Sequence, residues 1–237
     1  MSEHTQALRI WREFCDRIGV TKNAVLLFDQ DDQGQVRLKD IGASGSERRV
    51  LARSGPMEQL VKLEVGKLEE DYANARRRYD GLIYMMGRRT ANDFEPLYIG
   101  KTETLGRGGG KLSANILGLD APSSKFARWG YNYAYHLGDL SACVVPGHAP
   151  DKRTLKYQSW AEELFEQTLT ARPTLRTPIW FWATAWDSSR VGVWQDLGAT
   201  RLAFLEYLLI GVASLVSPRL LNREGLARGG SLSPGKE

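Results

Sequence analysis

The sequence has little cysteine: only Cys15 and Cys143 occur in its 237 residues, far apart and without metal-binding spacing around them. Such a pair indicates reduced thiols in a cytoplasmic protein rather than a disulfide framework or a cysteine-based metal site. Long apolar runs are also missing, and the longest, around residues 208–216, is far too short to span a bilayer. Charged residues interrupt every apolar stretch of the first thirty residues, so no signal peptide is expected there.

A strong overall charge is likewise absent, because the formal net charge is only +4. The surplus is nevertheless concentrated: residues 76–128 hold ten Lys or Arg and five Asp or Glu, a local excess of five. Such a segment is suited to a phosphate backbone, whose neutralisation releases counterions. A solvated basic face explains the charge about equally well, so the pattern alone does not decide between them. The hydrophobic content of 42% is ordinary for a globular protein with a real core.

Two short apolar segments near the middle of the chain have the composition of strands. The first is Gly81-Leu82-Ile83-Tyr84, and the second is Tyr98-Ile99-Gly100, which is followed by Lys101. The polar stretch between them, residues 88–93, is typical of a turn. The pair therefore predicts a β-hairpin with a long loop.

The rest of the chain alternates between helical and strand patterns. Apolar spacing predicts helices over residues 5–18, from Pro56 onward, over 157–165 and over 201–215, and strands over 24–28 and 179–186. The last of these strands is apolar and aromatic throughout, as expected of a central strand covered on both faces. We divide the chain into a mostly helical N-terminal accessory region (1–80), a main domain (81–225) and a flexible tail (226–237).

Glu206 lies in a predicted helix that is apolar almost all round. An ionised carboxylate in such surroundings is costly unless it is paired or bound to a cation. Partial exposure or an ion pair with an arginine is the structural alternative. Because one carboxylate with waters and a substrate phosphate is a common way to hold Mg²⁺, we interpret Glu206 as a ligand for a hard cation.

Five features follow one another along the chain: a strand with Tyr84, a strand with Tyr98-Ile99-Gly100, an arginine, a helix with Glu206, and Pro218 followed by Asn222. In this order, over residues 81–225, they resemble the GIY-YIG nuclease superfamily. The resemblance implies an α/β (α+β) fold with a small central sheet flanked by helices. It also implies an endonuclease that needs one Mg²⁺ or Mn²⁺ ion and hydrolyses phosphodiester bonds, with double-stranded DNA as the expected partner.

The resemblance also implies roles for single residues. The hydroxyls of Tyr84 and Tyr98 would activate and position the attacking water, although strand tyrosines are more often core residues. Gly100 would let the backbone approach a phosphate, and Lys101 would add a positive charge beside it. Asn222 would hold backbone of the active site through its side chain.

The catalytic arginine has two candidates. Compact members of the family carry it a few residues after the glycine, where Arg107 stands, but the glycines around Arg107 would hold it poorly. Longer members, including some restriction endonucleases, have an insertion at this point, and Arg128 in a better predicted helix fits that pattern. We favour Arg128, which would stabilise charge on the scissile phosphate. His136 follows it as a weaker candidate for a substrate contact, since a lone histidine among tyrosines is more often structural.

Two other classes of protein remain open at this point. A DNA-binding or regulatory module could have kept the fold and lost the chemistry, and a small-molecule enzyme could contain a coincidental Tyr-Ile-Gly. The choice between DNA and RNA, between restriction, repair and defence, and between sequence-specific and structure-specific cleavage is also open. Cutting both strands of a duplex would be easier for a homodimer than for a monomer.

Overall fold

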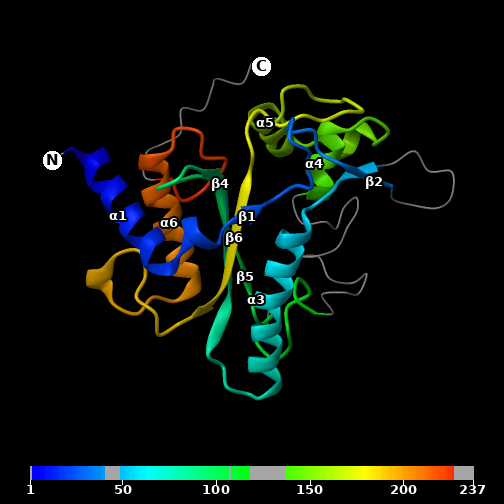
Figure 1. Cartoon of the computed structure of the whole chain (residues 1–237). Coiled ribbons are helices and arrows are strands. Elements are labelled where there is room, and N and C mark those ends of the chain that lie inside the picture. The colour runs from blue at the N-terminus through cyan, green and yellow to red at the C-terminus, as the bar shows by residue number, and fades with distance from the viewer. Residues whose placement is uncertain (1, 41–48, 107, 118–136, 227–237) are drawn as a thin grey trace, which may run out of the picture.

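The structure is a computed structural model that describes residues 2–40, 49–106, 108–117 and 137–226. Its main sheet has four antiparallel strands in the order β1-β6-β4-β5 (Figure 1). These strands are β1 (Val25–Leu26), β6 (Trp180–Asp187), β4 (Tyr79–Arg89) and β5 (Phe94–Glu103). A second, two-stranded sheet pairs β2 (Leu38–Asp40) with β3 (Arg49–Leu51). The predicted mixed α/β fold with a small sheet flanked by helices is confirmed.

Helices cover both faces of the main sheet (Figure 1). One face carries α1 (Glu3–Ile18) and α6 (Leu202–Val216), and the other carries α3 (Gly55–Ala73), with α4 (Leu137–Val144) and α5 (Leu155–Leu164) beside it. The short helices are α2 (Val20–Asn23), η1 (Pro150–Lys152) and η2 (Gln195–Leu197). Within the described ranges, no helix has the length and apolar character needed to cross a membrane.

The alternation of side chains along β4 explains why this strand lies inside the sheet. Ile83 and Met85 face α1 and α6, whereas Leu82, Tyr84 and Met86 face α3 and α5, and all five are buried. A strand with apolar side chains on both faces is stable only where both faces are covered. The same holds for β6, so the prediction of a strand covered on both faces over residues 179–186 is confirmed.

The hairpin of β4 and β5 has a shorter loop than the polar stretch 88–93 predicts. The strands continue to Arg89 and restart at Phe94, which leaves only residues 90–93 between them. Arg88 and Arg89 extend the strand because their side chains contact residues of α5 and β6. Arg88 donates to Glu163 at 2.6 Å, and the Arg89 guanidinium lies 4.6 Å from the centre of the Trp180 ring.

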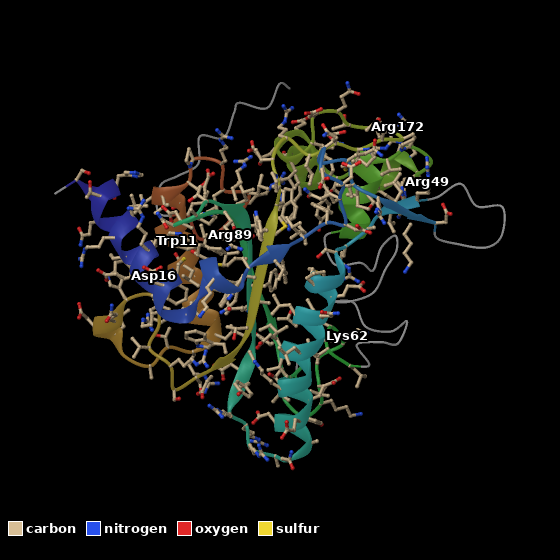
Figure 2. All side chains as sticks on the ribbon, in the orientation of Figure 1. Trp11, Asp16, Arg49, Lys62, Arg89 and Arg172 are labelled. Atoms are coloured by element: carbon tan, nitrogen blue, oxygen red, sulfur yellow. The ribbon has the colours of Figure 1, made fainter. Side chains whose placement is uncertain are left out.

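The N-terminal region packs directly onto the sheet and its helices. Its strand β1 pairs with β6, and α1 contributes Trp11, whose indole N–H donates to the carbonyl of Phe94 at 2.7 Å. Figure 2 shows Trp11 and Arg89 on the α1 side of the sheet, near the closed end of the hairpin. The boundary predicted at residue 80 falls inside β4, and the region before it supplies helices to both faces.

Candidate active site

The two motif strands lie side by side, and their register brings Tyr84 opposite Gly100. Tyr84 is buried, and its phenol ring extends across the Gly100 backbone: a Cβ atom added to Gly100 would overlap the ring and its hydroxyl oxygen. Gly100 is therefore required for close packing, not for an unusual backbone conformation. The Tyr84 ring therefore covers the Gly100 Cα on that face of the sheet.

Tyr98 lies on the same face as Tyr84, and their ring centres are 6.4 Å apart. It packs against Trp160 of α5 at 4.7 Å and is only half-buried. Burial, reinforced by the negative charge of Glu206, raises the pKa of the Tyr98 phenol to about 12. The hydroxyl is thus protonated at physiological pH and can donate a hydrogen bond.

Glu206 approaches the edge strand of the sheet from α6 and is half-buried. Its carboxylate lies near Lys101 on β5, the edge strand, because the charge and the backbone N–H of Lys101 both lower its pKa. Burial raises the pKa of Glu206, the Lys101 charge and N–H lower it, and the nearby charge of Glu103 raises it again; the net direction is upward. Although α6 and Tyr98 lie on opposite faces of the sheet, the negative charge of Glu206 contributes to the raised pKa of Tyr98.

Lys101 and Asn222 both act on the same edge strand. The Lys101 ammonium is 2.7 Å from the carboxylate of Glu103, so its charge is partly offset by an ion pair. The Asn222 amide makes two hydrogen bonds to one residue: its Oδ1 accepts from the Ile99 N–H at 3.0 Å, and its Nδ2 donates to the Ile99 carbonyl at 2.8 Å. The backbone hydrogen bonds expected of Asn222 are present, whereas its part in catalysis stays a prediction.

Three of the predicted site residues lie outside the described residues: Arg107, Arg128 and His136. The other six lie on or next to the edge strand β5, on four segments of chain. These are Tyr84 on β4, the run Tyr98, Gly100 and Lys101 on β5, Glu206 on α6, and Asn222 after α6.

Asp80 was not identified from the sequence, yet it positions the helix that carries Glu206. Its carboxylate accepts from the backbone N–H of Leu202 at 3.1 Å and pairs with Arg201 at 2.9 Å. It thus caps the first turn of α6 from the start of β4. No local pattern links positions 80 and 202, because ordinary capping signals lie within a few residues of the helix they cap.

A metal at this edge would have to rely on Glu206. Within the described ranges, no group of three or more His, Cys, Asp or Glu side chains could hold a metal ion. One half-buried carboxylate suits a cation that keeps most of its waters and gains further ligands from a substrate phosphate. The donor set therefore fits such a cation but not a closed protein cage.

Comparisons of the chain with models of protein families, with proteins of known function and with solved structures find no significant match to any of them.

Proposed function

We propose that the protein is a metal-dependent endonuclease of GIY-YIG type that hydrolyses phosphodiester bonds in DNA. The observation that carries this proposal is the gathering of Tyr98, Lys101 and Glu206 at the edge strand β5, where Lys101 acts on the pKa of Glu206 and Glu206 acts on the pKa of Tyr98. A carboxylate for a cation, a neutral phenol and an ammonium group, each partly exposed, then lie on or beside this strand. These are the groups that hydrolysis of a phosphodiester needs.

The order of the strands gives a second line of support. The strand with Tyr84 lies between β5 and β6, so the motif residues come from an inner strand and its edge neighbour. The edge position matters because a nucleic acid is too large to enter the core and must approach from outside. Helix α6 then brings its carboxylate to the same edge from the other face.

The roles of the side chains follow from their protonation and contacts. Hydrolysis adds water to phosphorus, breaks the bond to the leaving oxygen, and moves a proton from the water to that oxygen. Because the pKa of Tyr98 is raised to about 12, Tyr98 orients the water or phosphate by a hydrogen bond and is not a phenolate base. Lys101 contributes charge beside the phosphate, and Asn222 holds the intervening backbone at Ile99. Arg128, with Arg107 as the alternative, would neutralise the remaining charge.

Glu206 is the residue that would hold a Mg²⁺ or Mn²⁺ ion. When bound, such an ion supplies positive charge that stabilises the leaving oxygen. The charge and backbone N–H of Lys101 favour the ionised form of this carboxylate, and Asp80 caps the helix that carries it.

The test is cleavage of supercoiled plasmid, with linear DNA and RNA beside it, in Mg²⁺, in Mn²⁺ and in EDTA. Wild-type protein is compared with Glu206→Ala and with Glu162→Ala, a matched control that removes an exposed carboxylate from α5. We expect metal-dependent nicking by the wild type and by the control, and a loss of about 100-fold or more in Glu206→Ala. Binding of DNA at low salt should be nearly equal in all three proteins.

Two results would argue against the proposal. Equal cleavage by Glu206→Ala and wild type would remove Glu206 from the mechanism. DNA binding without any divalent-dependent cleavage would favour the alternative, a nucleic-acid-binding or regulatory module without catalytic activity.

A further inference from the structure

A pocket of about 910 Å³ opens at the far end of the hairpin, next to the candidate active site. Its walls are the end of α3, the start of β4, the end of β5, the first turn of α6, and the loop that follows β5, which we call the glycine loop after Gly106, Gly109 and Gly110. The pocket adjoins Glu206 in two ways. Ala203 lines it one turn before Glu206 on α6, and Glu103 lines it and pairs with Lys101.

The turn between α3 and β4 presents an arginine to this pocket. Asp71 is buried, and its carboxylate accepts from the backbone N–H groups of Arg78 (2.9 Å) and Tyr79 (3.2 Å), so the turn is fixed from within. Arg77 has a φ of 53°, in the left-handed region, which non-glycine residues rarely adopt. The fixed turn thus keeps Arg77, an exposed residue, at the pocket wall.

Among the described side chains that line the pocket, Asp80 and Glu103 form ion pairs, Asp71 accepts from backbone N–H groups, and Arg77 has no such partner. The carboxylate of Asp80 pairs with Arg201, and that of Glu103 pairs with Lys101. The neighbour Arg76 does not line the pocket and lies 3.6 Å from Glu70. Arg77, in contrast, has no ion pair or hydrogen bond from its side chain to any described residue, which leaves its guanidinium open to an anion.

The pocket also has an aromatic wall. Tyr72, at the end of α3, is 39% exposed and lines the pocket, and its hydroxyl donates to the Gly110 carbonyl at 3.1 Å. That hydrogen bond joins α3 to the glycine loop across the pocket. A fixed, exposed phenol ring beside an open guanidinium is suited to a nucleotide, because bases stack on aromatic rings and phosphates pair with Arg.

We infer that this pocket accepts one unpaired nucleotide of the nucleic acid, with its base against Tyr72 and its phosphate on Arg77. The inference rests on the proposed function and narrows its substrate to DNA with an extrahelical or single-stranded nucleotide near the cut. The volume falls in the range of about 300–1,000 Å³ that is typical of pockets for small molecules. A base inside a duplex is stacked and paired and cannot enter, and an already unpaired base saves most of the cost of extrusion.

The experiment measures fluorescence anisotropy of a labelled duplex and of the same duplex with one bulged nucleotide, in EDTA so that metal-dependent cleavage is stopped. A third DNA carries an abasic bulge. We expect wild type to bind the bulged duplex about 10-fold more tightly than the perfect one, and to lose this preference with the abasic bulge. Tyr72→Ala and Arg77→Ala should abolish the preference, and Arg77→Ala should also lower the salt dependence of binding by about one phosphate contact.

Arg76→Ala is the matched control, since it removes a neighbouring charge outside the pocket, and Tyr72→Phe removes only the hydroxyl. Thermal unfolding of each variant separates loss of binding from loss of folding. Equal binding of the perfect and bulged duplexes, or a preference that survives in folded Tyr72→Ala and Arg77→Ala, would overturn the inference and leave the nuclease proposal standing. A wild-type protein that neither binds any of the three DNAs nor cleaves DNA in Mg²⁺ would instead overturn the proposed function, and the inference with it.

Discussion

The phenol ring of Tyr84 occupies the space in which any side chain at Gly100 would begin. The two residues lie opposite each other on β4 and β5. The glycine leaves room for the aromatic ring, and the ring covers a glycine that would otherwise weaken the strand. The pair thus has a packing role that is independent of catalysis.

Substitution of Gly100 by alanine should therefore be destabilising. The new Cβ must push the Tyr84 ring or its strand aside, and overpacking of this kind costs about 1–3 kcal/mol. Urea unfolding measures the change in the free energy of unfolding. Gly66→Ala on α3 is the matched control, because a Cβ there meets nothing within 4 Å and alanine is favoured in a helix. A smaller loss for Gly100→Ala in a Tyr84→Leu background would confirm that the ring is the obstacle, and an equal loss in both backgrounds would contradict it.

Asn222 is expected to stabilise the edge strand at one point. Replacing it by alanine removes both hydrogen bonds to Ile99, and we expect a loss of about 1–3 kcal/mol together with faster hydrogen exchange of the Ile99 amide. Asn222→Asp keeps an acceptor for the Ile99 N–H but removes the donor, so it should protect this amide better than alanine does. Unchanged exchange at Ile99 in Asn222→Ala would show that solvent replaces the side chain without cost.

The local patterns of the sequence predict much of this fold but few of the contacts that shape the site. Apolar spacing alone is enough to predict α1, α3, α5 and α6, because each buries one face against the sheet. The position of Arg88 in a strand depends instead on Glu163, 75 residues away, and its polar neighbours predict a turn.

The same limit applies to the carboxylates that join helices to the sheet. Glu64 of α3 accepts from the Ala185 N–H on β6 at 2.8 Å, across 121 positions of sequence. Such a pairing leaves no periodic signal, and neither does that of Asp80 with Leu202. Glu206 stands out in the sequence as a carboxylate in an apolar helix, whereas Tyr98 and Asn222 are indicated only by the ordered resemblance, and spacing predicts no proximity among the three.

Tyr98 should titrate far above free tyrosine. Its pKa of about 12, compared with about 10 for an exposed phenol, means that the folded state disfavours the phenolate. The corresponding stability is fully present below pH 10 and is lost as the pH rises from about 10 toward 12. Ultraviolet difference titration of wild type against Tyr98→Phe measures this directly, with Tyr207→Phe as a control on an exposed tyrosine. Titration of Tyr98 near pH 10 while the protein is still folded would contradict its burial.

The ion pair of Asp187 with Arg78 fixes the end of β6 to the turn between α3 and β4. Its contribution to the free energy of unfolding should be lost at acid pH. Burial by itself raises the pKa of Asp187, but hydrogen bonds from Ser189 and from Arg78, the latter at 2.7 Å, outweigh burial and lower it to about 2. Because the folded pKa lies below the unfolded value of about 3.9, the stabilisation is present above about pH 4 and is lost as the pH falls toward 2.

Since Arg78 is largely exposed, solvent screening limits the loss in Asp187→Asn to about 1 kcal/mol at pH 7. That loss should shrink as the pH falls to 2, whereas Asp196→Asn, at an exposed carboxylate, should leave the acid limb of the stability curve unchanged. A penalty for Asp187→Asn that stays constant between pH 7 and pH 2 would show that the charge of Asp187 does not stabilise the fold, and that its neutral hydrogen bonds to Ser189 hold the end of β6.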